Sequence, residues 1–595
     1  MPARDEQTKL LDFVRCKDKR GWLATKVDLQ EFQLILDKEP AGAAAKDTEE
    51  GRTPMHHLAA RSLSATEYHV QMFGLLLQRV PECVVQKDNL GKLPQALVKE
   101  ATAEQPTKHN VKMLEMLLEA NKNGVAVGID IGLAFCCAAI FQNNKVEVIP
   151  NESHQDTTPH WVAFDGWDVH IGEAARRHAV KDAENSIFEI NRFAGKQFQD
   201  PAIQAHVKEL PFKVVNKLGG KPHVQVRHQD SVKDFVPEQL TALVLQRLKE
   251  NAELYLGKEV AHCVLTAPAH YSEAQRLALK QSATMCGMNV LRVINEPTAA
   301  AMAYGLHTAA QGNILVYDLG GGSFDVTLLT VEDGIFDVKE TAGDSQLGGA
   351  DFDQRLAVFC VAEMKRKSKT FKDPTTDPCV MRKILNKCEQ AKRSLSKDPQ
   401  TTIEIDDVLD GQGFYANITR AKFEELCGDL FRATLDPVDR VLRNAKVGKK
   451  QVQKVVMVGG STRIPKIQSL VADFFEGIEG LEIVKNVGAD VCIATGAAIQ
   501  AFKIANADTA NQEEQIELES VPISIGVETA GGVMTRIVQR GAELPINEQS
   551  FHLCTITEHQ PAILVQLYEG ERLFARDNEV RFCMTPSLIF RIKAR

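Results

Sequence analysis

The chain has 595 residues, a length that accommodates about four domains of ordinary size. Its hydrophobic share of 44% and charged share of 25% are those of a globular protein and exclude a mainly disordered chain. A net charge of -9 argues against a dominant nucleic-acid surface, because phosphate binding needs clustered Lys and Arg, so no nucleic-acid partner is expected.

Cysteine usage and the N-terminus indicate a compartment. The thirteen cysteines are scattered, odd in number and without metal-ligand spacing, and the first residues are charged where a secretory signal would be apolar. A reducing cytoplasmic or nuclear location is therefore expected. The run Val125–Phe141 contains Asp130, Gly128 and Gly132 and is too short for a membrane span, so it predicts strand, tight turn and strand, with no membrane partner.

Residues 1–123 have helical periodicity, for instance at Leu29–Leu36 and Val111–Leu118. Gly51–Ala60 resembles the ankyrin signature T-P-L-H-x-A, and Gly91–Leu97 is a degraded second copy. The two copies begin 40 positions apart, against a usual period of about 33, which requires an insertion. We expect an ankyrin-like region that binds a protein partner of unknown identity; an unrelated helical cap is the alternative.

From Val125 onward strands alternate with helices, which predicts an α/β domain. Within it, Gly128–Gly132 and Val316–Gly320 each end an apolar strand in Asp-x-Gly and re-enter another strand. This duplication predicts two similar lobes whose turns converge on one ligand. Nucleotide phosphate is the natural candidate, because glycine turns let backbone N–H groups approach an anion.

The second turn, which follows Asp318, has the residues best suited to phosphate binding. Gly320, Gly321 and Gly322 are consecutive, and Ser323 adds a hydroxyl donor. Asp130 and Asp318, at the two strand ends, would repel each other unless a cation lay between them, which predicts hydrated Mg²⁺. Each aspartate alone would be an ordinary turn residue.

Two further patterns are weaker when taken alone. The turn Val458–Pro465 joins a strand to a helix, a place that favours phosphate or ribose. Glu389, Lys392, Arg393 and Ser396 share one helix face, a pattern more typical of solvated ion pairs than of a site. No P-loop motif is present, and the GxGxxA stretch Gly411–Ala416 falls in a predicted hairpin, which weakens a Rossmann interpretation.

Together, five segments resemble, in order, the signatures of the heat shock protein 70 family, the seventy-kilodalton heat-shock chaperones. The resemblance runs from about Val125 to Phe502. The five segments are Asp130–Gly132, Ile294–Ala301, Asp318–Asp325, Gly343–Asp353 and Val458–Pro465.

The resemblance implies an α/β actin-like, two-lobed nucleotide-binding domain over 124–504 that binds ATP or ADP with Mg²⁺. Asp130 and Asp318 would hold the metal through water, and Glu296 would orient the attacking water, with Ser323 completing the catalytic set. The residues implied for nucleotide binding are Gly132, Leu133, Gly320, Gly321, Gly322, Ser323, Gly348, Gly349, Glu389, Lys392, Arg393, Ser396, Gly460, Ser461 and Arg463.

Two positions depart from the family pattern. Asn191 stands where the family has a lysine beside the terminal phosphate, and Leu133 stands where it has a threonine. Loss of one preorganised donor commonly lowers kcat by about 10²–10³, so slow or absent ATP hydrolysis is expected. The alternative is that Arg192 or another neighbour takes over the role of the lysine.

The C-terminal part resembles the family's peptide-binding region only in part. Residues 505–520 are polar and acidic and predict a linker, and 521–595 resemble the opening of the family's β-sandwich. The segment is too short for the remaining strands and the helical lid, so we expect an incomplete sandwich with weakened binding of unfolded client proteins. J-domain and nucleotide-exchange co-chaperones follow by analogy with the family.

The leading hypothesis is an ATP-binding chaperone-like protein for protein folding and stress response, whose ankyrin-like region recruits a partner. A non-catalytic interaction adaptor with a structural actin-like domain is the main alternative. A sugar or glycerol kinase shares the fold, but the peptide-binding remnant from Val521 argues against it.

Overall fold

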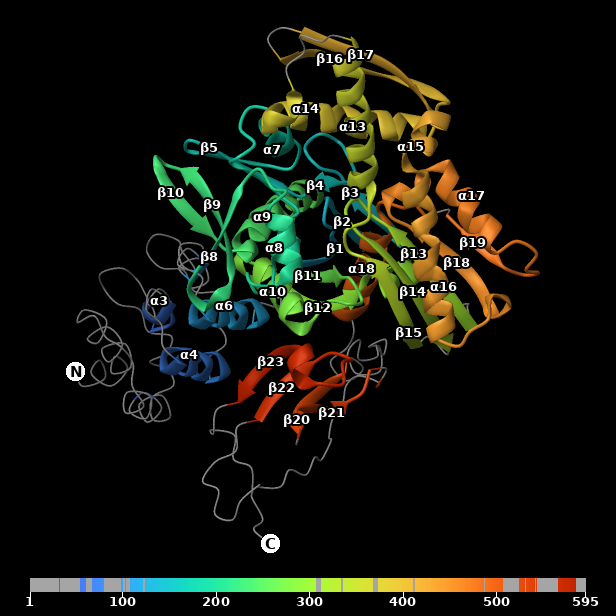
Figure 1. The fold of residues 1–595 in the computed structure, drawn as a ribbon. Coiled ribbons are helices and arrows are strands. Elements are labelled where there is room, and N and C mark those ends of the chain that lie inside the picture. The colour runs from blue at the N-terminus through green and yellow to red at the C-terminus, as the bar shows by residue number, and fades with distance from the viewer. Residues whose placement is uncertain are drawn as a thin grey trace, which may run out of the picture. The chain divides into compact units, whose positions relative to one another are not determined.

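The computed structural model describes most of the chain between Gly124 and Asn506, with shorter stretches on either side (Figure 1). Within the described part, no helix is long and apolar enough to cross a membrane. Apart from Phe32, the predicted helix Leu29–Leu36 lies outside it, as does the second ankyrin-like copy. The described residues are 32, 54–59, 67–79, 98–99, 102, 108–120, 124–305, 312–332, 335–367, 373–409, 412–485, 487–506, 524–529, 531–540, 542 and 565–584.

The chain divides into two compact units. The first comprises 1–127, 236–264 and 278–292, and the second comprises 128–235, 265–277 and 293–595. Three strands contribute residues to both units: β1 (Val125–Ile131), β11 (Val260–Ala267) and β12 (Asn289–Asn295).

Two sheets have the same strand order when one of them is read in the reverse direction. The first runs β12-β11-β1-β2-β3, with β4 paired to β2, and the second runs β15-β14-β13-β18-β19. In each, the hairpin that follows the aspartate is antiparallel, with Asp130 opposite Cys137 and Asp318 opposite Asp325. The predicted duplication is therefore present in the fold. The other strands are β2 (Phe135–Gln142), β3 (Lys145–Ile149), β4 (Thr158–Pro159), β13 (Gly312–Leu319), β14 (Phe324–Glu332), β15 (Ile335–Asp344), β18 (Val452–Val458) and β19 (Glu482–Val484).

Close glycine packing joins the central strand β1 to α18 (Cys492–Asn506), and α18 to α11 (Glu296–Ala303). A Cβ at Gly128 would lie 2.0 Å from the backbone nitrogen of Ala498, and one at Gly496 would lie 1.8 Å from the carbonyl oxygen of Ala299. Neither position can take a larger residue without backbone movement. The packing fixes α11 and the acidic residue at its first position, Glu296.

The second sheet is covered by a large helical core. Its buried side chains include Phe324, Phe352, Phe423 and Phe431, and Figure 1 shows α16 beside β14 and β15. The GxGxxA stretch lies at a β16–β17 hairpin, where Leu409 pairs with Gln412, so that prediction is confirmed. The elements are α13 (Gly349–Lys367), α14 (Pro378–Leu395), β16 (Gln400–Leu409), β17 (Gln412–Thr419), α15 (Arg420–Ala433), α16 (Leu435–Asn444) and α17 (Pro465–Phe474), with short 3-10 turns at Pro374–Thr376, Lys449–Gln451 and Gly460–Arg463.

Along the chain, the residues between β4 and helix α9 (Pro237–Leu256) form two three-stranded sheets, in the order β6-β5-β7 and β10-β9-β8. Helix α7 packs on β5, where Ala175 and Ala179 contact Trp161 and Ala163. These elements are β5 (Trp161–Asp165), β6 (Asp168–Ile171), α7 (Glu173–His178), β7 (Ser186–Phe188), a 3-10 turn at Ile190–Arg192, α8 (Pro201–Val207), β8 (Lys213–Asn216), a 3-10 turn at Leu218–Gly220, β9 (Pro222–His228) and β10 (Ser231–Phe235).

The first unit holds the described N-terminal helices together with α9 (Pro237–Leu256) and α10 (Glu273–Met285), of which residues 278–285 belong to this unit. Val111 of α6 packs with Ala242 and Met285, and Glu115 of α6 pairs with Lys280. The predicted helix Val111–Leu118 is thus confirmed inside α6 (Lys108–Ala120). The ankyrin-like stretch contributes α3 (Pro54–Ala59), which contacts α4 (Glu67–Arg79); two short helices do not by themselves establish ankyrin repeats.

The C-terminal segment contains one four-stranded antiparallel sheet in the order β21-β20-β22-β23. Its strands are β20 (Ile525–Thr529), β21 (Val533–Val538), β22 (Val565–Glu569) and β23 (Glu579–Met584), with a 3-10 turn at Ala575–Asp577. The predicted linker begins inside α18, which continues to Asn506, and its remainder lies outside the described residues.

Candidate functional site

A cavity of about 850 Å³ lies within the second unit, and all of its lining residues belong to that unit. The ends of β1, β13 and β18, the start of α11 and one face of α14 meet there. Gly322, Gly348 and Gly349 do not line it. The predicted site residues that the cavity brings together are Asp130, Gly132, Leu133, Glu296, Asp318, Gly320, Gly321, Ser323, Glu389, Lys392, Arg393, Ser396, Gly460, Ser461 and Arg463.

The three predicted catalytic carboxylates form one acidic cluster. Burial raises the pKa of Asp130 to about 6, although the Thr266 hydroxyl donates to it at 3.0 Å. Burial, then Asp325 and Asp130, raises the pKa of Asp318 well above its ordinary value. Burial, then Asp130, Asp318 and Asp325, raise the pKa of Glu296. Like charges out of water disfavour ionisation, so the cluster favours an added cation.

Several features of this cluster suit a divalent oxygen-binding cation. Asp130 and Asp318 end equivalent strands, and carboxylates are the ligands that Mg²⁺ prefers. A Cβ at Gly459, which has φ of +83°, would lie 2.7 Å from Oδ1 of Asp318, so only glycine leaves room beside this oxygen. The donor set and its uncompensated charge therefore fit Mg²⁺ held near both aspartates.

The glycine turns hold one another in place. Gly349 N–H donates to the carbonyl of Gly320 at 3.0 Å, and Ala350 N–H donates to that of Gly321 at 2.8 Å. A Cβ at Gly348 would lie 2.6 Å from the Gly322 backbone nitrogen, which explains why position 348 needs glycine. Gly348 and Gly349 thus lie against the turn at 320–323.

His160, absent from the sequence predictions, braces the first turn. Its Nδ1 lies 2.9 Å from the carbonyl oxygen of Gly132, and its backbone N–H donates to the Ala134 carbonyl at 2.9 Å. Burial lowers the pKa of His160 to about 4, so the ring is neutral at physiological pH and Nδ1 carries the donated proton. No sequence signal marked this histidine, because the carbonyls it contacts are distant along the chain.

The two departures from the family pattern lie beside this turn. The Asn191 side-chain nitrogen donates to the carbonyl of Ile131 at 3.1 Å and is buried. One methyl of Leu133 lies 2.9 Å from where a Cβ on Gly322 would be, so an apolar group faces the second glycine turn. Neither side chain supplies positive charge to the cavity.

Arg192, the alternative source of charge, lies close by. Its guanidinium donates to the Gly322 carbonyl at 2.8 Å and also to the Ser345 carbonyl and the Glu189 carboxylate. His206 Nε2 lies 3.3 Å from the same carboxylate. Arg192 lines the cavity but is engaged by backbone carbonyls at the second glycine turn.

The polar face of α14 points toward the cavity because its apolar face is buried. Asp377 caps the helix by accepting from the N–H groups of Cys379 and Val380. Val380, Ile384, Cys388, Ala391 and Leu395 are buried at helical spacing, which leaves the opposite residues for the site. Arg393 also lies over the ring of Phe135, 5.1 Å from its centroid.

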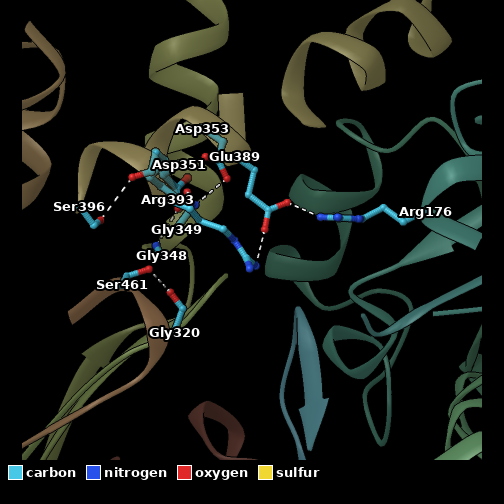
Figure 2. Close-up of polar contacts among 11 residues, drawn as sticks. Arg176, Gly320, Gly348, Gly349, Asp351, Asp353, Glu389, Arg393, Ser396 and Ser461 are labelled. Carbon is cyan, nitrogen blue, oxygen red and sulfur yellow. Dashed lines mark hydrogen bonds and ion pairs between the residues drawn. The ribbon is translucent and has the colours of Figure 1, made fainter. Parts of the chain in front are cut away.

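Ion pairs organise this face, as Figure 2 shows. Glu389 lies between Arg176 of α7, at 2.5 Å, and Arg393, at 2.7 Å. Burial alone would raise the pKa of Glu389, but Arg176, Arg393 and Lys392 outweigh burial and lower it. Glu389 is therefore ionised and fixed in position.

Lys392 and Ser461 connect this face to the glycine turns. Lys392 donates at 2.7 Å both to Asp353 and to the Gly349 carbonyl. Ser461 donates to the Gly320 carbonyl at 2.9 Å, as Figure 2 shows. Burial raises the pKa of Asp353 to about 7 against the effect of Lys392. Arg463 pairs with Asp490 at 2.8 Å, a cavity residue that the sequence did not indicate.

Comparisons with known proteins agree with this arrangement. The family model described as "Hsp70 protein" matches residues 126–583. "Heat shock 70 kDa protein" of Neurospora crassa is 48% identical over 459 residues, covering 76% of this chain and 70% of that protein. "Heat shock cognate 70 kDa protein 3" of Dictyostelium discoideum is 43% identical over 461 residues, covering 76% of this chain and 72% of that protein.

Proposed function

Because the chain belongs to the Hsp70 family, we propose that it is a chaperone that binds ATP or ADP with Mg²⁺ in the cavity of its second unit. The observation that carries the proposal is the convergence of an acidic cluster, glycine turns and an ion-paired helix face on one cavity. Such a set matches a nucleotide. The acidic cluster suits a metal ion that binds the phosphates, the glycine turns suit phosphates bound by backbone N–H groups, and the helix face suits adenosine.

The residues have separate tasks in this proposal. Asp130 and Asp318 hold hydrated Mg²⁺, which neutralises charge on the phosphates when it is bound. Glu296 orients water, and Ser323 with the N–H groups of the turn at 320–323 faces phosphate oxygens. Gly348 and Gly349, which lie against this turn, add phosphate contacts. Glu389, Lys392, Arg393, Ser396, Gly460, Ser461 and Arg463 surround ribose and adenine, and Gly132 and Leu133 contribute backbone contacts.

ATP hydrolysis is weak or absent in this account. Asn191 brings an amide whose N–H donates to the Ile131 carbonyl, and an amide carries no charge to stabilise the transition state. Arg192 is the nearby cation, but its guanidinium is engaged by the carbonyls of Gly322 and Ser345. Binding without efficient turnover would make the protein an ATP-sensing chaperone.

The terminal regions extend the proposal. In this proposal, an ankyrin-like region at 1–123 recruits a protein partner, and the domain at 124–504 binds nucleotide. A linker at 505–520 joins that domain to the segment 521–595, which binds unfolded clients weakly. J-domain and exchange co-chaperones act on the nucleotide-binding domain. A reducing cytoplasmic location suits the cysteines of the described part of the chain, all of which are free thiols.

Equilibrium binding and single-turnover hydrolysis of ATP·Mg²⁺, measured on the full chain and on Asn191→Lys, test the proposal. We expect both proteins to bind ATP·Mg²⁺ and the variant to hydrolyse it about 10²–10³ times faster. Asn417→Lys, on the β16–β17 hairpin, is the control for an added positive charge. Ordinary turnover by the unaltered chain would show that Arg192 or another group replaces the lysine. Absence of ATP binding would favour the non-catalytic adaptor.

A further inference from the structure

A hairpin and the end of a helix bring one carboxylate and two imidazoles together outside the nucleotide cavity. In the β5–β6 hairpin, Asp165 pairs with Asp168 and His170 pairs with Ala163. Because residues two apart on a strand share a face, Asp165, Ala163 and His170 lie on the same face. Helix α7 packs on Ala163 and ends at His178, which adds the third side chain.

The ligand atoms of these three residues lie within 4.8 Å of one another, and within the described part of the chain they form the one His, Cys, Asp and Glu group of this kind. Nε2 of His178 is 3.3 Å from Oδ2 of Asp165, and Nε2 of His170 is 4.0 Å from the same oxygen. Ligands of tetrahedral Zn²⁺ stand about 3.4 Å apart, given bonds of about 2.1 Å. The cluster needs only a small contraction to reach this spacing.

A neighbouring strand orients one imidazole. Ser186 of β7 pairs with Ala163, so its hydroxyl lies on the same face as the cluster. The Ser186 hydroxyl donates to the Asp182 carbonyl at 2.6 Å and lies 3.5 Å from Nδ1 of His178. Placing the proton of a neutral imidazole on Nδ1 leaves the Nε2 lone pair directed at the Asp165 carboxylate, an arrangement that a shared cation stabilises.

Access to the cluster is open on one side. The side chain of His178 is 10% exposed, that of His170 is 35% exposed and that of Asp165 is 63% exposed. A metal ion can therefore enter from solvent and keep one water molecule as its fourth ligand. The supporting backbone is regular strand and helix, so the three side chains start from fixed positions.

We propose that Asp165, His170 and His178 form a binding site for one divalent transition-metal ion, with Zn²⁺ as the expected occupant. Two imidazoles and one carboxylate suit Zn²⁺ and disfavour Mg²⁺, which prefers oxygen ligands alone. The site is separate from the acidic cluster proposed for nucleotide-bound Mg²⁺, and it does not depend on that function.

The direct test is titration of the full chain with Zn²⁺ against a chromophoric chelator, in reducing buffer with saturating Mg²⁺. His178→Asn keeps a side-chain donor near Ser186 but removes Nε2, and His170→Gln removes the second imidazole. We expect each variant to weaken Zn²⁺ binding by about 100-fold, since loss of an outer-shell partner alone costs about 10–100-fold. Ser186→Ala is expected to weaken binding by about tenfold.

His154→Asn is the matched control, because His154 is exposed and its φ of +56° is one that asparagine adopts readily. Its Zn²⁺ affinity is expected to equal that of the unaltered chain. Equal affinity in His170→Gln and His178→Asn would overturn the proposal. Absence of stoichiometric binding by the unaltered chain would also overturn it.

Substitution with Co²⁺ supplies a second readout that does not require any variant to fold. Imidazole and carboxylate ligation of Co²⁺ gives visible d–d bands without the sulfur-to-metal charge-transfer band of thiolate ligation. We expect the former spectrum from the unaltered chain. A thiolate band would assign the metal to cysteines and contradict the site at His178.

Discussion

The carboxylates at the two ends of the proposed nucleotide cavity have pKa values shifted in opposite directions. At the acidic end, burial raises the pKa values of Asp130, Asp318 and Glu296, and repulsion from neighbouring carboxylates adds to the rise at Asp318 and Glu296. On the α14 face, Glu389 is held between two arginines, and its pKa is lowered. The first region gains stability from an added cation, whereas the second has its cations built in.

This difference predicts that Mg²⁺ and the α14 side chains contribute differently to ATP binding. The α14 face is preorganised, because Lys392 and Ser461 already contact the carbonyls of the glycine turns. At the acidic end, Asp130 accepts from the neutral Thr266 hydroxyl, which does not offset the repulsion among the carboxylates. Nucleotide affinity is therefore expected to depend strongly on Mg²⁺ and only weakly on further ordering of the α14 side chains.

The largest expected effect comes from removing charge at the acidic end. Asp318→Asn is expected to weaken Mg²⁺-dependent ATP binding by about 10–100-fold, because a water-mediated carboxylate contact is lost. The same variant is expected to be more stable than the unaltered chain without metal, because repulsion with Asp130 is relieved. Calorimetric ATP titrations and thermal unfolding in EDTA measure these two effects.

Asp406→Asn is the control for this prediction, since Asp406 is exposed on β16. It is expected to leave both ATP affinity and metal-free stability unchanged. Tight ATP·Mg²⁺ binding by Asp318→Asn would remove Asp318 from the metal site and with it the contrast between the two ends.

The next largest effect concerns the turn between β1 and β2. In the folded state the pKa of His160 is lowered to about 4, so the folded chain resists protonation of this ring. The unfolded chain protonates the ring once the pH falls below its ordinary pKa, near 6.5. The resulting stability is present above about pH 6.5 and is lost as pH falls toward 4. His160→Asn keeps a donor for the Gly132 carbonyl but cannot titrate.

Denaturant unfolding at several pH values between 7 and 4 tests this prediction. The unaltered chain is expected to lose about 2–3 kcal/mol more of its free energy of unfolding across this window than His160→Asn. Parallel pH profiles would contradict a lowered pKa for His160 in the folded state.

The smallest effect is expected at the ion-paired end. Arg176→Met leaves Glu389 with Arg393, whose side chain is 59% exposed and whose charge is screened by solvent. The pKa of Glu389 is expected to rise, and adenosine affinity to fall by about tenfold. Arg177→Met, at the exposed neighbouring position, is expected to bind adenosine normally. An equal loss in both variants would assign the effect to α7 folding and not to the ion pair.

The sequence identified the residues proposed to contact a nucleotide better than the residues that position them. Asp130 and Asp318 could be found because a strand, an Asp-x-Gly turn and a strand occur twice, and this repeat is local in sequence. The hairpin over 400–419 was also local. Arg176 could not be found, because its partner Glu389 is 213 positions away and only the folded chain brings them together.

The same limit explains His160 and the cluster at Asp165, His170 and His178. Each depends on which strands pair and which helix packs on them, and a lone histidine on a strand has no periodic signal. Gly348 and Gly349 show a different limit, since a glycine motif predicts a close backbone approach but not which segment it approaches, here the turn at 320–323.

Titration calorimetry of ATP into the full chain, with Mg²⁺ and then with EDTA, tests the central claim most directly. The account predicts one bound ATP per chain in Mg²⁺ and binding weakened by about 10-fold or more in EDTA, because the repulsion between Asp130 and Asp318 then returns. Absence of ATP binding in Mg²⁺, or binding of the same strength in EDTA, would contradict it.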